Sequence, residues 1–279
     1  MIIKADYHFH PNLPKDKNKA LNKAKKWWKC FQDKGINAVI ITEHVYKDPK
    51  YSYYTMKEAC PDDIICFPGI EYTTKEGIDL IVFSNSETIY DHKQLNTTFA
   101  MTLDEVIKLI QNDDKIFSYI THPFTLGATS IVKILGIDVF SKYVNIVNAV
   151  EISNGSFNHL IKILELPPFR FLLKNRLEWA MRTQSLPKRY YPDKLSFVAV
   201  GSDAHIFQDL GSYIKINAES FDKDIAFKSM TTTSNGKVHL DKQPFSLVSL
   251  LKNFPIVLNE FIIKKKIKLC SKLSLKHSG

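Results

Sequence analysis

The chain has 279 residues, of which 44% are hydrophobic and 24% charged, and its formal net charge at pH 7 is +9. This composition excludes an intrinsically disordered chain, and the length suits one large domain or two small ones with a well-buried core. No apolar run reaches the roughly 20 residues that a membrane-spanning helix needs. The N-terminus enters an apolar run without a leader segment, so we expect a cytoplasmic protein that does not bind membranes.

Short apolar runs alternate with helical patterns along the chain. We expect strands at residues 2–8, 38–43, 64–70, 78–84, 116–121, 147–153, 197–202 and 212–217. We expect helices near residues 18–34, 51–59, 102–113, 129–141 and 158–182. The strand runs are rich in Val, Ile and Phe without clean alternation, as in strands that are covered on both faces. Seven or eight such units predict a largely parallel sheet that closes into a barrel rather than staying open.

Two stretches break this regularity. Residues 156–196 are longer than a simple crossover between two strands needs, and they carry Arg170, Arg176, Arg182 and Arg189. Residues 236–279 form a basic C-terminal extension that we expect to be helical. From residue 237 onwards this extension contributes +7 of the net charge of +9. It could bind nucleic acid or an anionic surface, and the other interpretation is a solvated or frayed helix end.

Histidines and acids gather where the predicted strands end. Five of the nine histidines lie at or just past the end of a strand, namely His8, His10, His44, His122 and His205. Three carboxylates end strands in the same way, namely Glu71, Glu151 and Asp203. In a parallel barrel these ends lie on one face, where the active site is built. Unpaired, so many buried polar groups would be costly, whereas a cluster of Zn, Mn or Fe ions would satisfy them.

Two of the motifs share a spacing. His8 and His10 stand two residues apart, and so do Asp203 and His205. Side chains at positions i and i+2 of a strand point to the same face, so both members of a pair can reach one ion. Either motif alone is a weak signal. In this order and at these strand ends, the two pairs indicate two walls of one metal site.

These motifs resemble those of the PHP family of phosphoesterases, named for polymerases and histidinol phosphatase. In chain order they are His8/His10, Glu43/His44, Gly69-Ile70-Glu71, His122/Pro123 and Gly201 to His205. The resemblance covers residues 1–235, which we expect to form one PHP-like domain with the 156–196 insertion near its active-site face. It implies an α/β fold, a distorted (β/α)7 TIM-like barrel, followed here by the helical, lysine-rich extension of residues 236–279.

The resemblance also implies two or three divalent ions per chain, Mn, Zn or Fe. His8, His10, Glu71 and Asp203 are similar to the ligands of the first ion, with Glu71 bridging to the second. His122 is similar to a ligand of the second ion, and His44 and His205 to ligands of the third. Asp79 stands where many members have a histidine, and Asp16 is the nearest counterpart of a ligand in the loop after the first motif.

The activity implied is hydrolysis of a phosphate ester by a metal-bridged hydroxide. Clustered divalent ions lower the pKa of a bridging water and neutralise phosphoryl charge. Glu71, Asp203 and His205 are the candidate catalytic residues, and Asp203 or His205 could also carry a proton. Glu43 and Asn154 are candidates for orienting the ligands.

The expected partner is a phosphorylated small molecule or nucleotide. Two alternatives stay open. One is a metal-dependent nuclease or nucleotide phosphohydrolase that binds nucleic acid through the basic extension. The other is a non-catalytic PHP-like barrel that serves as an RNA-binding or scaffold subunit.

Overall fold

The computed structural model describes residues 1–125, 129–147, 149–175, 177–178, 195–232, 237–240, 255 and 262–267. Its strands are β1 (Ile2–Phe9), β2 (Ala38–Ile41), β3 (Ile65–Thr73), β4 (Asp79–Ser84), β5 (Ile116–Ile120), β6 (Ala149–Asn154), β7 (Phe197–Gly201), β8 (Ser212–Asn217) and β9 (Lys237–Leu240). Its α-helices are α1 (Lys17–Lys34), α2 (Pro49–Glu58), α3 (Leu103–Gln111), α4 (Ile131–Leu135), α5 (Ile137–Val147), α6 (Gly155–Leu164), α7 (Phe169–Leu172) and α10 (Lys223–Thr232). Among the helices described, none is long and apolar enough to cross a membrane.

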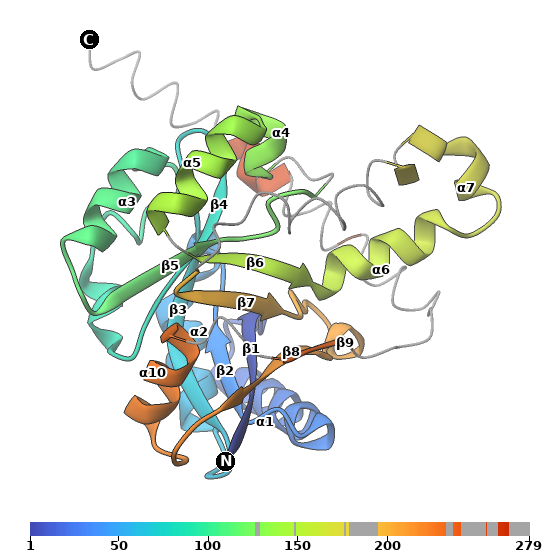
Figure 1. The fold of residues 1–279 in the computed structure, drawn as a ribbon. Coiled ribbons are helices and arrows are strands. Elements are labelled where there is room, and N and C mark those ends of the chain that lie inside the picture. The colour runs from blue at the N-terminus through green and yellow to red at the C-terminus, as the bar shows by residue number, and fades with distance from the viewer. Residues whose placement is uncertain are drawn as a thin grey trace.

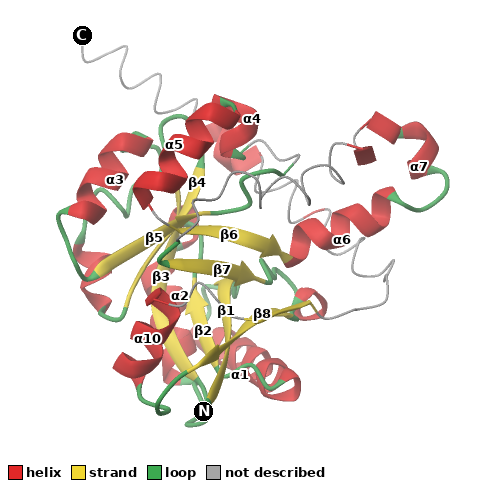
Figure 2. Ribbon diagram, in the orientation of Figure 1, coloured by secondary structure: helices red, strands yellow, loops and turns green. Residues whose placement is uncertain are grey.

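The strands form one mixed sheet that curls into a barrel with helices around it (Figures 1 and 2). Their order is β7-β6-β5-β4-β3-β2-β1-β8-β9. Strands β1 to β3 are parallel to one another, and so are β5 to β7, whereas β4 runs antiparallel to both of its neighbours. The expected α/β barrel is confirmed. Because β4 is reversed, its first residue, Asp79, lies opposite Thr73 at the end of β3.

Two different segments lie along one edge of β1. Its first half pairs antiparallel with β8, from Ile2 opposite Asn217 to Ala5 opposite Ile214. Its second half meets the chain that leaves β7: the amide of Asp203 donates to the carbonyl of His8 at 2.7 Å, and the amide of His10 donates to that of Ala204 at 3.1 Å. These bonds close the barrel between β7 and β1.

Gly201, the last residue of β7, lets this closure be tight. A Cβ atom at this position would stand 2.1 Å from the Cβ of His8 and 2.9 Å from its amide nitrogen. No side chain fits there unless one of the two strands moves. The glycine that opens the "GSDAH" motif is therefore a packing requirement of the strand that carries the first histidine pair.

Aromatic side chains fill the barrel interior. Tyr7 packs edge-on against Phe83 and Tyr119 and stacks on Phe197. Helix α10 packs against this cluster, and the hydroxyl of Tyr7 donates to the carbonyl of Met230 at 2.9 Å. A second apolar layer lies between the sheet and the outer helices. The two layers hold the strand ends rigidly, which is what a site assembled from several strands requires.

Some helices and strands begin or end at other residues than the sequence pattern predicted. The helix expected over 129–141 is two helices, which separate at Gly136, where φ is +87°. In the 156–196 insertion, α6 leaves the end of β6 and α7 projects away from the barrel (Figure 1). Strand β9 pairs with β8, so the sheet continues past residue 235, where we expected the extension to begin. Arg176, Arg182, Arg189 and most lysines of the extension lie outside the described residues.

Candidate metal centre

A register shift in β1 turns its two histidines toward the site. The pairing of β1 with β2 shifts between Asp6 and Phe9. Tyr7 belongs to the interior aromatic cluster, whereas Phe9 packs on the opposite side, 4.7 Å from the ring of Trp27. In a regular strand Tyr7 and Phe9 would share a face. The bulge reverses this alternation, so that Phe9 faces helix α1 while His8 and His10 face the site.

His8, His10 and Asp203 form the first group that could hold a cation. The Nε2 atoms of the two histidines lie 3.0 Å apart. Oδ1 of Asp203 lies 3.5 Å from Nε2 of His8 and 3.4 Å from Nε2 of His10. Nδ1 of His8 lies 3.1 Å from a carboxylate oxygen of Glu151, which can only accept, so this nitrogen carries the proton in neutral His8. The Nε2 lone pair of His8 then faces a second imidazole nitrogen and a carboxylate, an arrangement that suits a bound cation.

Glu71 lies at the centre of the cluster. Its Oε1 is 3.7 Å from Nε2 of His8 and 3.3 Å from Nε2 of His122. Its Oε2 is 3.4 Å from Nε2 of His10 and 2.5 Å from Nδ1 of His44. One buried carboxylate thus contacts four histidines from three segments of the chain. This is the position that a bridging ligand needs.

The second group comprises Glu71, Asp79 and His122. His122 follows β5, and Asp79 begins β4 rather than ending it. The reversed direction of β4 therefore brings Asp79 to the same edge as the ends of β3 and β5. Oδ1 of Asp79 accepts a hydrogen bond from Thr73 at 2.5 Å, and Oδ2 lies 2.8 Å from the ammonium of Lys264.

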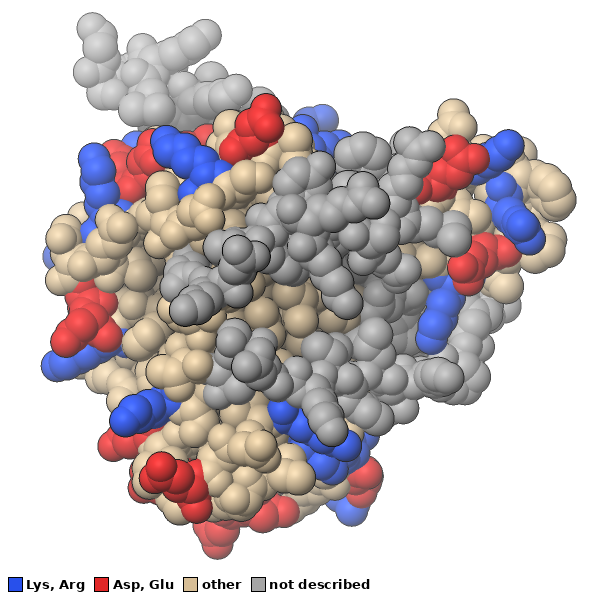
Figure 3. All heavy atoms as spheres, viewed as in Figure 1, with Lys and Arg blue, Asp and Glu red and all other residues tan. Residues whose placement is uncertain are grey.

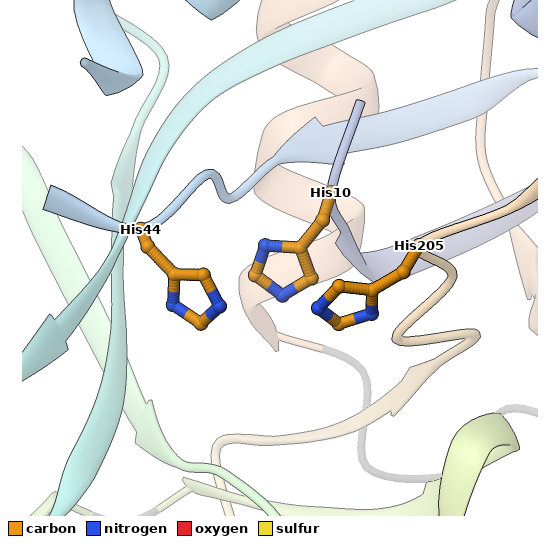
Figure 4. A group of neighbouring side chains, drawn as sticks. All are labelled: His10, His44 and His205. Atoms are coloured by element: carbon orange, nitrogen blue, oxygen red, sulfur yellow. The ribbon is translucent and has the colours of Figure 1, made fainter. Parts of the chain in front are cut away.

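The third group comprises His10, His44 and His205, whose rings converge on one another (Figure 4). The ring of His10 stacks on that of His44, with centroids 4.4 Å apart, and on that of His205, with centroids 4.5 Å apart. Nδ1 of His205 lies 2.9 Å from the carbonyl oxygen of Asp203. A carbonyl only accepts, so Nδ1 carries the proton in neutral His205 and leaves Nε2 as its donor atom for a cation.

Glu151 belongs to none of the three groups but contacts side chains and backbone that surround them. Its Oε1 contacts Nδ1 of His8 at 3.1 Å. Its Oε2 accepts from the hydroxyl of Thr121 at 3.0 Å, from the amide of His122 at 2.6 Å and from the side chain of Asn154 at 3.2 Å. The same Asn154 amide lies 3.1 Å from Oδ2 of Asp203. Such outer hydrogen bonds fix the orientation and the tautomer of metal-binding side chains.

Glu43 faces Nδ1 of His10 as Glu151 faces Nδ1 of His8. Its Oε1 lies 3.5 Å from Nδ1 of His10, and its Oε2 accepts from the amide of Asn12 at 2.8 Å. The ammonium of Lys47 contacts Asn12 and lies 3.9 Å from Glu43, while that of Lys23 donates to the carbonyl of Asn12 at 2.7 Å. Glu43 and Asn154 were expected to orient the ligands. In the structure Glu43 faces His10, and Asn154 contacts Asp203. Thr121 and the two lysines carry no motif in the sequence that would have marked them as part of the site.

Burial and charge act against each other on the pKa values of these groups. Burial alone would lower the pKa of His8, but Asp203 and Glu151 raise it to about 10. Burial alone would raise the pKa of Asp203, but the charge on His8 and a hydrogen bond with His10 hold it below its usual range. For Glu43, the bond with His10 and the charge of Lys47 outweigh burial and lower the pKa to about 2. The acids are therefore ionised at neutral pH, as ligands of a cation must be.

Two of the site residues have strained backbones. His122 has φ +29° and Asp203 has φ +49°, both in the region that non-glycine residues rarely occupy. The carbonyl and amide contacts around them, including the bond from His122 to Glu151, hold this conformation. Strain of this kind concentrates at functional sites, where the surrounding structure over-determines it.

The structure brings together eight of the nine residues predicted as ligands. The three groups contain His8, His10, His44, Glu71, Asp79, His122, Asp203 and His205. Asp16 is the exception: it is exposed and caps the N-terminus of α1, where its carboxylate accepts from the amide of Lys19 at 2.8 Å. The carboxylate of Asp16 is used by the local helix cap, and Asp16 lies outside the three groups.

Comparisons with known proteins bear on the fold. No family model matches the sequence, and no curated protein matches it. The structure of PsfC from Pseudomonas syringae PB-5123 is similar with a TM-score of 0.54 and 17% identity, over 95% of this chain and 99% of PsfC. The lesion-specific endonuclease PfuEndoQ from Pyrococcus furiosus is similar with a TM-score of 0.51 and 12% identity, over 85% of this chain and 58% of that protein. At these identities the similarity shows a shared fold.

Proposed function

We propose that the protein is a metal-dependent phosphoesterase that acts on a phosphorylated small molecule or nucleotide. The observation that carries this proposal is the convergence of five histidines with Glu71, Asp79 and Asp203 in three overlapping groups. The mixed imidazole and carboxylate donors suit Mn, Zn or Fe ions. Bound there, two or three such ions would activate water at neutral pH and neutralise the charge of a phosphoryl group.

The chain's own residues have distinct parts in this proposal. Glu71 belongs to the second group, and its Oε1 also faces His8 of the first group, so one carboxylate can serve both groups. Asp203 has a low pKa and stays ionised, so it can bind a cation or accept a proton but cannot donate one. His205 is held by the carbonyl of Asp203, which fixes the ring within the third group.

The experiment is a screen of the purified chain loaded with Mn, Zn or Fe. Generic phosphate monoesters, phosphodiesters and short oligonucleotides are the substrates, and Asp203→Asn and His8→Ala are the matched inactive variants. We expect hydrolysis of at least one ester class by the wild type and none by the two variants, with the fold of both retained by circular dichroism. Turnover near the wild-type rate in either variant would remove the metal centre from the mechanism.

A nuclease is the second candidate. One similar structure is a lesion-specific endonuclease, and the extension carries +7 of the net charge. On the face shown in Figure 3, however, acidic and basic side chains of the described residues are interspersed rather than separated by sign. Cleavage of an oligonucleotide whose binding weakens steeply with salt, with a log–log slope near −0.7 per contacted phosphate of a single strand, would favour the nuclease. We rank the small-molecule substrate first.

A further inference from the structure

Lys264 connects the C-terminal extension to the metal centre. Residues 262–267 are helical, and this segment brings the ammonium of Lys264 to 2.8 Å from Oδ2 of Asp79. The side chain of Asp79 is 2% exposed and that of Lys264 is 15% exposed, so the pair is largely removed from water. From the sequence, the extension could be a binding segment for nucleic acid or a solvated helix end, and neither interpretation placed a residue in the site.

The contact places Lys264 beside one of the three groups that could hold a cation. Asp79 belongs to the group that also contains Glu71 and His122, and the ammonium of Lys264 contacts Asp79 directly. A ligand that approaches these three residues meets the ammonium as well.

An anchoring role for the extension explains this pair poorly. Taking two charges out of water costs about as much free energy as their attraction returns, so one largely buried ion pair is weak evidence for a stabilising contact. The neighbouring Lys265 and Lys266 are exposed and keep the segment hydrated. The contact with Asp79 is therefore better explained by a function of Lys264 within the site.

Binding of an anion is the role that the chemistry favours. The centre contains several ionised acids, and a phosphate ester brings further negative charge to it. Among the described residues, Arg170 is exposed on α7, which projects away from the barrel in Figure 1, while Lys23 and Lys47 contact Asn12. Lysine binds phosphate as a compact point charge that carries several N–H donors.

We propose that Lys264 binds the phosphoryl group of the substrate on the Asp79 side of the metal centre, so that the C-terminal extension completes the active site. This inference rests on the proposed phosphoesterase function. It assigns the extension to recognition of a single phosphoryl group rather than to a track along nucleic acid. It also predicts that one lysine of the extension matters far more than its neighbours.

The test compares Lys264→Met, which keeps the apolar stem, and Lys264→Ala with Lys265→Ala and Lys266→Ala as matched controls. Inorganic phosphate is titrated into each metal-loaded, full-length protein by calorimetry, and bound metal is counted by elemental analysis. We expect both Lys264 variants to bind phosphate about tenfold more weakly or worse, with unchanged metal content. The controls should stay within about twofold of the wild type.

Three outcomes would overturn the inference: unchanged phosphate affinity in folded Lys264→Met, an equal loss in the two controls, or a gain of bound metal in the Lys264 variants. The last would mean that the ammonium competes with a cation for Asp79. Phosphate binding is measured without turnover, so it separates this inference from the proposed function. If no ester is hydrolysed but phosphate affinity still depends on Lys264, the reaction is wrong and the binding role stands.

Discussion

The Nε2 atoms of His8 and His10 lie 3.0 Å apart, and both face Oδ1 of Asp203 within 3.5 Å. Two imidazole nitrogens at this distance need a proton or a cation between them, because two lone pairs repel each other. The pKa of His8 is raised to about 10, so a proton fills this role at neutral pH when no cation competes for it. Binding of a cation at this pair would therefore be linked to the loss of a proton from it.

We predict that binding of the first divalent ion releases a proton from the protein at pH 7. The pKa of His8 is raised, so the proton is bound at every pH below about 10, and the apparent metal affinity should rise by about tenfold for each pH unit in that range. Calorimetry in buffers of different ionisation enthalpy counts the protons. His92→Gln, in a partly exposed pair with Asp113, is the control and should release the same number. A heat that is independent of the buffer would contradict the prediction.

Asp16→Ala should leave the metal content unchanged and destabilise the fold. The carboxylate caps helix α1 through the amide of Lys19, and losing such a cap costs about 1 kcal/mol. Urea denaturation measures the loss of stability, and elemental analysis measures the metal. If Asp16→Ala loses an ion while α1 keeps its stability, the assignment made from the sequence was right and the helix cap is incidental.

The sequence predicted the site better than the path of the chain around it. His8, His44, His122 and His205 follow buried apolar runs, and a polar residue just after such a run must lie at the end of a strand, so their convergence could be predicted. The direction of β4 could not be predicted, because a strand that is covered on both faces has the same apolar pattern in either direction. The strand expected at 78–84 therefore did not place Asp79 among the strand ends, and only the family resemblance pointed to this residue.

Contacts made by long hydrophilic side chains left no signal in the sequence. Lys264 stands in a run of lysines, any of which could equally have been solvated. Asp16 precedes a helix, where an acid can cap the helix or reach a metal, and the sequence does not show which bond forms. The bulge in β1 could not be predicted either, because the residues from Asp6 to Phe9 have the pattern of an ordinary strand.

Gly201→Ala should disrupt the metal centre through the backbone. The added Cβ would overlap the Cβ of His8, so β1 and β7 must separate, at a cost of about 3 kcal/mol or more. Gly136→Ala is the control: unlike Gly201, this glycine has a positive φ, so an alanine there costs about 1–3 kcal/mol of backbone strain, but nothing lies within 4 Å of its added Cβ. We expect both variants to melt earlier in thermal denaturation, and only Gly201→Ala to lose bound metal. Equal metal content in the two variants would contradict the role of Gly201 in the site.

Glu151→Gln tests whether a side chain that hydrogen-bonds to a histidine ligand sets the tautomer of that histidine. Glu151 accepts from Thr121, the amide of His122 and Asn154 through one oxygen and contacts Nδ1 of His8 through the other. A glutamine that keeps its oxygen toward the first three must turn its NH₂ toward His8. That NH₂ donates, so Nδ1 of His8 must accept, and the proton moves to Nε2, which then cannot bind a cation.

We therefore expect Glu151→Gln to lose about 10- to 100-fold in metal affinity while its fold is retained. Competition with a metal-binding dye measures the affinity, and histidine ¹⁵N chemical shifts report which nitrogen of His8 carries the proton. Glu58→Gln is the matched control, because the same change at a half-exposed position that pairs with Lys17 should alter neither quantity. A shift of the proton to Nε2 without loss of affinity would mean that His8 does not bind the metal. Loss of affinity without that shift would mean that Glu151 acts through its charge, which raises the basicity of His8, rather than through the tautomer.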